Sequence, residues 1–130
     1  MTMKILLVED DAEIVNSITL AFQFYLPEVQ LLTTHLGKQA VKIVKKEQPA
    51  AIILDLGLPD ITGFDVLKKV RQFSDVPVII LTVRTYEEDV LQAIKERAND
   101  FVAKPFRQLD LIKRLKALLE SAADTPPASV

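Results

Sequence analysis

Short apolar runs alternate with stretches of helical spacing along this chain, and that alternation restricts the possible folds more than any other feature. Five runs rich in aliphatic and β-branched residues stand far enough apart to leave room for a helix in each interval. These runs are Ile5–Val8, Val29–Leu32, Ala51–Leu54, Val78–Leu81 and Phe101–Ala103. Most of them lack a strict apolar and polar alternation, which is typical of parallel strands covered on both faces.

The intervals carry apolar residues at steps of three or four, the spacing of an amphipathic helix. The first predicted helix is marked by Ile14, Ile18 and Phe22 and is closed by Pro27. The other four are marked by Ala40, Ile43 and Val44; by Val66, Leu67 and Val70; by Val90, Leu91 and Ile94; and by Leu109, Ile112, Leu115 and Leu119. Strands and helices in strict alternation predict an α/β fold, a (βα)5 doubly wound parallel five-stranded sheet with right-handed crossovers.

Composition excludes several functional classes. The 130 residues suit a single domain. With 16 Lys and Arg against 18 Asp and Glu, the net charge of −2 argues against nucleic acid binding by this chain itself, though not by a domain outside it. The absence of cysteine rules out disulfides, thiol catalysis and Cys-ligated zinc, and fits a cytoplasmic protein. No stretch approaches the ~20 apolar residues of a membrane span.

Polar residues follow four of the five predicted strands. Glu9 and Asp10 come after the first, Asp55 after the third, Thr82 after the fourth and Lys104 after the fifth. Because ligands of open α/β sheets bind beyond the carboxyl ends of the strands, these side chains are expected to share one rim. The next acid, Asp11, is expected to cap the first helix.

This set of side chains suits phosphoryl transfer. Three neighbouring carboxylates repel one another unless a cation neutralises them, and ligands that are all oxygen select a hard ion such as Mg²⁺. Lys104 supplies a second positive charge, so that the oxygens of a transferring phosphoryl group can be stabilised. Asp55 is the best placed nucleophile for an aspartyl phosphate. Thr82 can donate a hydrogen bond to a phosphoryl oxygen.

Four segments, in this order, resemble the receiver domain of bacterial two-component response regulators. They are Ile5-Leu-Leu-Val-Glu-Asp-Asp11, Asp55-Leu-Gly-Leu-Pro-Asp-Ile-Thr-Gly63, Leu81-Thr82 and Lys104-Pro-Phe106. The resemblance implies a flavodoxin-like receiver fold over residues 1–120, followed by a tail or the start of a linker at residues 121–130. The segment from Lys104 to Ile112 and the Ala, Pro and Ser residues after it are most similar to the winged-helix transcription-factor branch.

The resemblance also implies roles for the rim residues. Asp55 would accept a phosphoryl group from the phosphohistidine of a sensor histidine kinase and become a 4-aspartylphosphate. Mg²⁺ would be held by Asp10 directly, by Glu9 mainly through water, by Asp55 and by the backbone carbonyl of Gly57. Such a chain is a phosphorelay switch rather than an enzyme, and at most hydrolyses its own acyl phosphate.

The same resemblance implies a switch and an output face. Thr82 and Lys104 would bind the phosphoryl oxygens, and Lys104 would precede a cis proline. Phe101 occupies the aromatic switch position and would turn inward as Thr82 moves toward the phosphate. Transcription-factor members form a phosphorylation-dependent homodimer through the fourth helix, fifth strand and fifth helix. The matching residues here are an apolar patch of Leu91, Ile94 and Ile112 and a charged pair of Asp100 and Arg114.

Some positions depart from the family pattern. Val83 stands where Ala or Gly is usual, which predicts a narrower phosphorylation pocket and slower reaction with small donors. Gly57 and Arg84 occupy positions that tune the access of water, so the lifetime of the phosphorylated state is left open. Arg97 replaces a glycine that ends the fourth helix, and a Cβ in a left-handed residue costs about 1 kcal/mol. Phe101 lacks the hydroxyl of the commoner tyrosine.

Three other functions remain as alternatives. The first is an interaction domain that works without phosphorylation, against which Asp55, Thr82 and Lys104 argue. The second is an aspartyl-phosphate hydrolase, which normally has a second acid two residues after its nucleophile, where this chain has Gly57. The third and weakest is flavin binding, since the rim is acidic and the first strand is not followed by a phosphate-cradling loop.

Overall fold

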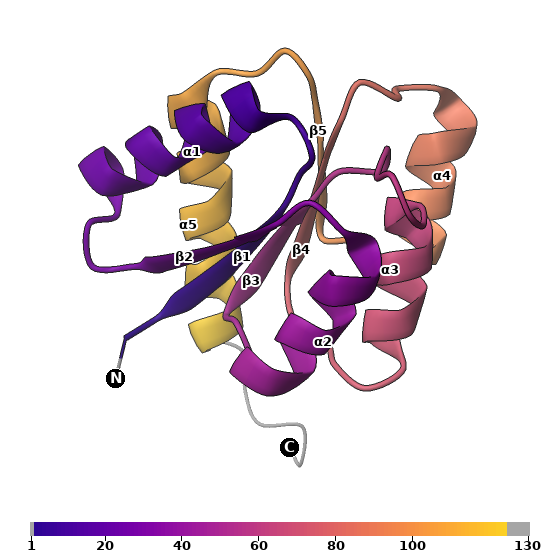
Figure 1. Cartoon of the computed structure of the whole chain (residues 1–130), viewed down its shortest axis with the longest axis horizontal. Helices are drawn as coiled ribbons and strands as arrows, with labels where there is room; N and C mark the ends of the chain where they lie inside the picture. Colours follow the sequence, from indigo (N-terminus) through magenta and orange to yellow (C-terminus); the bar gives the residue numbers. More distant parts are fainter. Residues whose placement is uncertain (1, 125–130) are drawn as a thin grey trace.

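One parallel sheet of five strands runs through the middle of the molecule in a computed structural model that describes residues 2–124 (Figure 1). The strand order is β2-β1-β3-β4-β5. The strands are β1 (Lys4–Val8), β2 (Gln30–Thr34), β3 (Ala51–Leu54), β4 (Val78–Thr82) and β5 (Asp100–Ala103). The helices between and after them are α1 (Ala12–Tyr25), α2 (Gly37–Glu47), α3 (Gly63–Arg71), α4 (Glu87–Lys95) and α5 (Gln108–Asp124). The predicted doubly wound α/β fold is confirmed.

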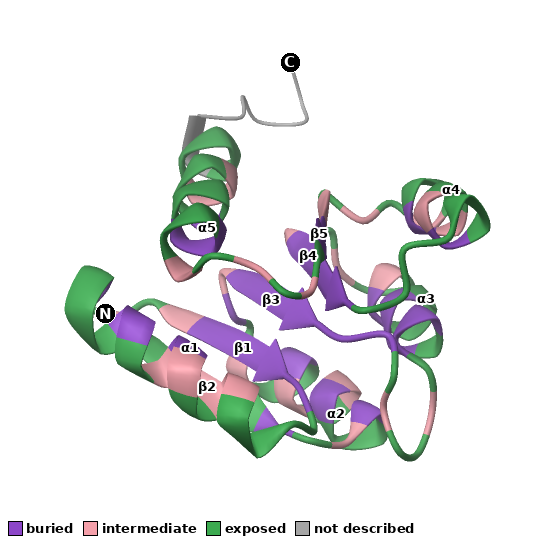
Figure 2. Ribbon diagram, turned by 90° about the horizontal axis from the view of Figure 1, so that it is seen from above, coloured by how far each residue is buried: buried purple, intermediate pink, exposed green. Residues whose placement is uncertain are grey.

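Two apolar cores flank the sheet, which explains why the strand sequences lack polar alternation. Ile5 and Leu7 of β1 pack with α1 and α5, whereas Leu6 and Val8 pack with α2 and α3 on the other face. Successive side chains of a strand point to opposite faces, so a strand with helices on both sides must be apolar at every position. Figure 2 shows β1, β3 and β4 as the buried centre of the molecule.

The bounds of the edge strand β2 differ from the predicted ones. It runs from Gln30 to Thr34, whereas the apolar run had indicated Val29–Leu32. The two threonines pair in register with the end of β1, Thr33 with Leu7 and Thr34 with Val8. Backbone pairing therefore carries β2 beyond its apolar residues, because an edge strand needs less burial than a central one.

Helix α1 begins where the acidic cluster predicted. The side chain of Asp11 accepts hydrogen bonds from the backbone N–H groups of Glu13, at 2.9 Å, and Ile14, at 3.4 Å. These bonds satisfy two of the amide groups left free at a helix start. Asp11 is therefore a capping residue, as expected, and points its carboxylate at the helix and not at the rim.

Helix α4 ends with a residue in the left-handed region, because Arg97 has a φ of 67°. The side chain of Arg71, at the end of α3, holds the backbone at this position. Its Nη2 and Nε donate to the carbonyl oxygen of Arg97 at 2.9 and 3.2 Å, and its Nη1 donates to the carbonyl of Val76 at 2.7 Å. The α4–β5 connection is thus held by an arginine from another helix.

Helix α5 is longer than the sequence suggested. It continues to Asp124, so residues 121–124 are helical where an extended tail or linker was expected. The rest of that predicted tail, residues 125–130, lies outside the described residues. Across residues 2–124, the structure contains no helix with the length and apolar character needed to cross a membrane.

Candidate functional site

Three acidic side chains meet at the carboxyl ends of β1 and β3. Val8 and Leu54 are in register, and the backbone N–H of Asp55 donates to the carbonyl of Val8 at 3.0 Å. The residues that follow these two strands must therefore be neighbours. Carboxylate oxygens of Glu9, Asp10 and Asp55 lie within 4.8 Å of one another. Glu9 and Asp55 are buried, whereas Asp10 is exposed.

Lys104 reaches this acidic cluster from the loop after β5. Its Nζ lies 2.5 Å from Oε1 of Glu9 and 3.1 Å from Oδ2 of Asp55, and its side chain is only 10% exposed. The peptide bond between Lys104 and Pro105 is cis, as the family resemblance implied. One ammonium thus pairs with two carboxylates that are far from it in the sequence.

The electrostatics of the cluster follow from its burial. Burial raises the pKa of Glu9 to about 7, although the hydrogen bond from Lys104 acts in the opposite direction, and the negative charge of Asp55 adds to the rise. For Lys104, burial by itself lowers the pKa, but the bonds to Glu9 and Asp55 outweigh it and raise the pKa above its ordinary value. The amine is therefore a permanent positive charge at this site.

The loop after Asp55 is shaped by a close backbone approach. Gly63 donates its N–H to the carbonyl of Leu56 at 2.9 Å. A Cβ on Gly63 would lie 2.3 Å from the carbonyl oxygen of Asp55 and 2.7 Å from Cα of Leu56, so only glycine fits there. Gly57, by contrast, has open space around it, and its N–H donates to Oδ1 of Asp55 at 3.2 Å. Both oxygens of Asp55 are thereby held.

Asp60, in the same loop, ties the site to α2. Its two carboxylate oxygens accept hydrogen bonds from the backbone N–H groups of Gly37, at 2.8 Å, and Lys38, at 2.9 Å. Helix α2 has no capping side chain of its own at Leu36. The loop that follows Asp55 thus supplies the missing cap, a role for Asp60 that sequence reasoning missed.

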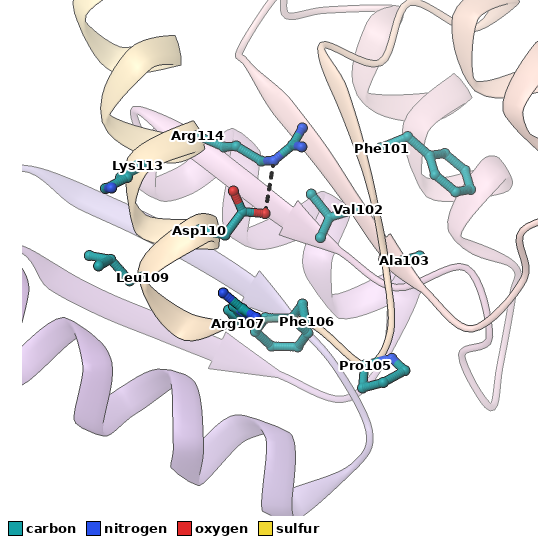
Figure 3. Close-up of a pocket in the computed structure, with 10 residues that line it drawn as sticks. All are labelled: Phe101, Val102, Ala103, Pro105, Phe106, Arg107, Leu109, Asp110, Lys113 and Arg114. Carbon is teal, nitrogen blue, oxygen red and sulfur yellow. Dashed lines mark hydrogen bonds and ion pairs between the residues drawn. The ribbon is translucent and has the colours of Figure 1, made fainter.

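Thr82 is the last residue of β4, and Phe101 lies on β5, two residues before its carboxyl end. Thr82 is buried, and its Oγ1 accepts a hydrogen bond of 3.1 Å from the N–H of Arg84. The ring of Phe101 is half-buried against the core on the side of α3 and α4. Figure 3 shows this ring pointing away from α5, on the opposite side of β5 from Val102.

An apolar depression of about 440 Å³ opens next to Lys104. Its lining includes Ile14 of α1, Val83 and Phe106. Val83 is 72% exposed at this edge of the site. The effect of Val83 on the width of the phosphorylation pocket stays a prediction.

The expected output face is corrected in one respect. Leu91 and Ile94 are exposed on α4, but Ile112 is only 1% exposed and packs in the core beneath α1 and α5. Ile112 faces inward because its helical neighbours Leu111 and Leu115 form the buried stripe of α5. It therefore does not belong to an exposed apolar patch.

The charged residues of this face are paired within the chain. Nη1 of Arg114 lies 3.0 Å from Oδ1 of Asp100, and its Nε lies 3.2 Å from Oδ2 of Asp110. Figure 3 shows Arg114 and Asp110 beside a cavity of about 560 Å³ between β5 and the start of α5. An intermolecular pair between Asp100 and Arg114 would compete with the internal one.

The donor set fits a hard divalent cation. It consists of carboxylate oxygens alone, two of them buried and one open to solvent, in a cluster that Lys104 neutralises in part. Such oxygen ligands are the ones that Mg²⁺ prefers, usually with several waters retained. Glu9, Asp10 and Asp55 could therefore hold a magnesium ion.

Comparison with known proteins agrees with the fold. Residues 5–116 match the family model of the response regulator receiver domain. The chain is 32% identical over 126 residues to the DNA-binding response regulator MtrA of Mycolicibacterium paratuberculosis, covering 97% of this chain and 55% of that protein. It is 36% identical over 115 residues to the transcriptional regulatory protein KdpE of Mycobacterium tuberculosis, covering 87% and 49%.

The solved structures that resemble this chain are also receiver domains. The signal receiver domain of a putative LuxO repressor protein from Vibrio parahaemolyticus superimposes with a TM-score of 0.87 at 28% identity, covering 95% of this chain and 94% of that one. The receiver domain of the sensor histidine kinase PA1611 from Pseudomonas aeruginosa, which is described with a magnesium ion in its active site cleft, has a TM-score of 0.82 at 27% identity. The two chains are covered to 93% and 100% respectively.

The fold and the sequence matches define a signalling domain of two-component systems. The chain belongs to the response regulator receiver domain family, whose members act in phosphorelay signalling and not as typical enzymes. Its relatives include DNA-binding and transcriptional regulators, consistent with the winged-helix branch. The chain spans about half the length of these curated relatives.

Proposed function

We propose that Asp55 accepts a phosphoryl group from the phosphohistidine of a sensor histidine kinase, in a reaction that depends on Mg²⁺. The observation that carries this proposal is the setting of the Asp55 carboxylate. One of its oxygens is held by the Lys104 ammonium and the other by the Gly57 N–H, inside a cluster of acids that suits a divalent cation. Such a carboxylate is oriented and charge-compensated, as a nucleophile toward phosphorus needs to be.

The transfer exchanges one bond for another. A carboxylate oxygen of Asp55 forms a bond to phosphorus while the bond between phosphorus and the donor imidazole nitrogen breaks. The imidazole leaves with that electron pair and takes up a proton from solvent. Lys104 stabilises the negative charge on the phosphoryl oxygens, and the Thr82 hydroxyl donates to one of them.

Glu9, Asp10, Asp55 and the backbone carbonyl of Gly57 would hold the magnesium ion, which supplies Lewis-acid stabilisation of the phosphoryl oxygens when bound. The same groups would support slow hydrolysis of the acyl phosphate. The apolar depression beside Lys104 offers a surface on which the donor domain can dock while its phosphohistidine faces Asp55.

The output of the switch is a change at the α4-β5-α5 face. Phosphorylation replaces the single negative charge of the Asp55 carboxylate by up to about two on the phosphoryl group. Thr82 then moves toward the phosphoryl group and Phe101 turns inward. The exposed Leu91 and Ile94, together with Asp100 and Arg114, are proposed to join two copies of the chain. Since the relatives include DNA-binding regulators about twice as long, an effector domain outside this chain would control transcription in the cytoplasm.

The test is intact-mass measurement after incubation with Mg²⁺ and acetyl phosphate. A single phosphoryl adduct is expected, which requires Mg²⁺ and is absent from Asp55→Asn. An adduct that persists in Asp55→Asn, or forms equally well in the presence of a chelator, would overturn the assignment. If neither the wild type nor Val83→Ala forms an adduct or binds Mg²⁺, the domain works without phosphorylation.

A further inference from the structure

Helix α4 turns a polar edge inward. Its buried residues are Asp89 and Ala93, whereas the apolar Leu91 and Ile94 are 58% and 66% exposed. Figure 2 shows α4 standing at one side of the molecule with a narrow buried edge. Ala93 packs in the apolar core, but a helix that buries an acid and exposes two large aliphatic side chains is held in place by more than apolar packing.

A single ion pair accounts for the burial of Asp89. Nη2 of Arg84 lies 2.9 Å from Oδ1 of Asp89, whose residue is 4% exposed. The other oxygen, Oδ2, is buried and has no hydrogen-bond partner among the residues that the structure describes. The carboxylate therefore depends on one guanidinium, and this guanidinium belongs to a side chain that is 46% exposed.

The same arginine contacts the phosphoryl-binding threonine. The backbone N–H of Arg84 donates to Oγ1 of Thr82 at 3.1 Å. Arg84 thus contacts the Thr82 hydroxyl through its amide and the inner edge of α4 through its side chain.

We propose that Asp89 is a positioning residue which acts through Arg84 to hold Thr82 and α4 in the unphosphorylated arrangement. For the movement of Thr82, the proposal rests on the function proposed above. When the Thr82 hydroxyl turns to a phosphoryl oxygen, the Arg84 amide loses its acceptor, and the loop from Val83 to Tyr86 rearranges. The side chain of Arg84 then leaves Asp89.

The release of Arg84 favours a movement of α4. Once Arg84 has left, Asp89 is a buried carboxylate without a charged partner, and such a charge strongly destabilises the arrangement that buries it. Asp89 must therefore reach water. It can do so by a rotation of α4, which also repositions Leu91 and Ile94 on the output face. The ion pair therefore acts as a latch between the phosphoryl site and α4.

Hydrogen–deuterium exchange of the α4 amides in the unphosphorylated full chain tests the latch directly. Arg84→Met removes the guanidinium but keeps much of the side-chain bulk, and is expected to speed exchange of residues 87–95 at least tenfold. Adding Asp89→Leu to Arg84→Met removes the unpaired carboxylate, and exchange is expected to return to within about threefold of the wild type. Lys4→Met, which breaks the Lys4–Glu47 ion pair on β1 and α2, is the matched control and should leave α4 exchange unchanged.

Two results would overturn the proposal. The first is an α4 exchange rate in Arg84→Met that equals the wild-type rate, and the second is an equally fast exchange in the single and double variants. Urea unfolding of each variant separates a local opening of α4 from a general loss of stability. General loss would speed exchange in all helices, and that result also counts against the latch.

A second measurement links the latch to the phosphoryl site. Beryllofluoride, a phosphoryl mimic, should speed α4 exchange in the wild type but change it less than twofold in Arg84→Met, where the latch is already open. Equal responses in both proteins would show that Arg84 does not carry the signal. Because the first experiment needs no phosphorylation, a failure of the phosphoacceptor assignment at Asp55 would be distinguishable from a failure of the latch.

Discussion

Gly63→Ala is expected to destabilise the domain and displace Asp55, although Gly63 lies in the first turn of α3, where alanine normally improves a helix. The added Cβ would lie 2.3 Å from the carbonyl oxygen of Asp55 and 2.7 Å from Cα of Leu56. Favourable separations between such atoms are about 3.5–4.0 Å, so the two backbone segments must move apart by about 1 Å. Neither contact atom belongs to a flexible side chain that could turn aside.

The cost can be estimated from these contacts. Overpacking of a filled interior costs about 1–3 kcal/mol and sometimes more. Weakening the hydrogen bond from the Gly63 N–H to Leu56 adds about 0.5–1.5 kcal/mol. The helix preference of alanine returns about 0.5–1 kcal/mol. We therefore expect Gly63→Ala to lower the free energy of unfolding by about 0.5–4 kcal/mol.

Gly57→Ala is the matched control in the same loop. An added Cβ at Gly57 meets nothing within 4 Å, and none of the glycines has a positive φ. Its effect on the unfolding free energy should stay within about 0.5 kcal/mol. Urea unfolding measures both variants, and Mg²⁺ titration reports whether Asp55 has moved. The reasoning fails if Gly63→Ala is as stable as the wild type, or if the two variants lose equal stability.

Four further predictions follow from the site and its surroundings. Because the pKa of Glu9 is raised to about 7, ionised Glu9 becomes more abundant as pH rises, and the apparent affinity for Mg²⁺ should increase about tenfold between pH 6 and 8. Calorimetric titration checks this, and an equally steep pH dependence in Glu9→Gln would contradict it. The N–H groups of Lys38 and Gly37 lower the pKa of Asp60 to about 2, so its contribution to stability is present above pH 3.8 and is lost as pH falls through 2. Asp60→Asn should therefore be less stable than the wild type at pH 7, with a smaller difference near pH 2; urea unfolding at both pH values decides. Arg97→Gly relieves the left-handed residue and should stabilise the domain by about 0.5–1 kcal/mol, measured by urea unfolding. A lower unfolding midpoint would contradict this and show that the contacts of the Arg97 side chain matter more than its backbone. Val83→Ala should react faster with acetyl phosphate and dephosphorylate faster than the wild type, and equal rates in a mass-based time course would refute a narrowed pocket.

Much of the rim was predictable because its residues directly follow the strands in the sequence. Residues that directly follow buried parallel strands reach the same edge of the sheet, whatever their separation in the chain. Glu9, Asp55 and Thr82 were placed by this rule alone, and the structure brings Glu9 and Asp55 into contact with one lysine. The apolar runs predicted the central strands well for the same reason, since burial on both faces leaves no polar position.

The orientation of helix α4 could not be predicted in this way. Helical spacing of Val90, Leu91 and Ile94 indicates a helix but not the face that it turns to the sheet. Leu91 and Ile94 are exposed, whereas Ile112 of α5, assigned to the same patch, is buried. A helix with apolar residues in several directions can dock in more than one way, and only its neighbours select one.

The sequence alone therefore determined the fold class, the order of strands and helices, and which side chains end at the rim. Those features depend on periodicity and on residues adjacent in the chain. The tertiary structure alone decided that Asp60 caps α2, that Gly63 must lack a Cβ, and that Asp89 is buried against Arg84. These contacts join separate elements or set the angle at which a helix packs, and no local pattern records them.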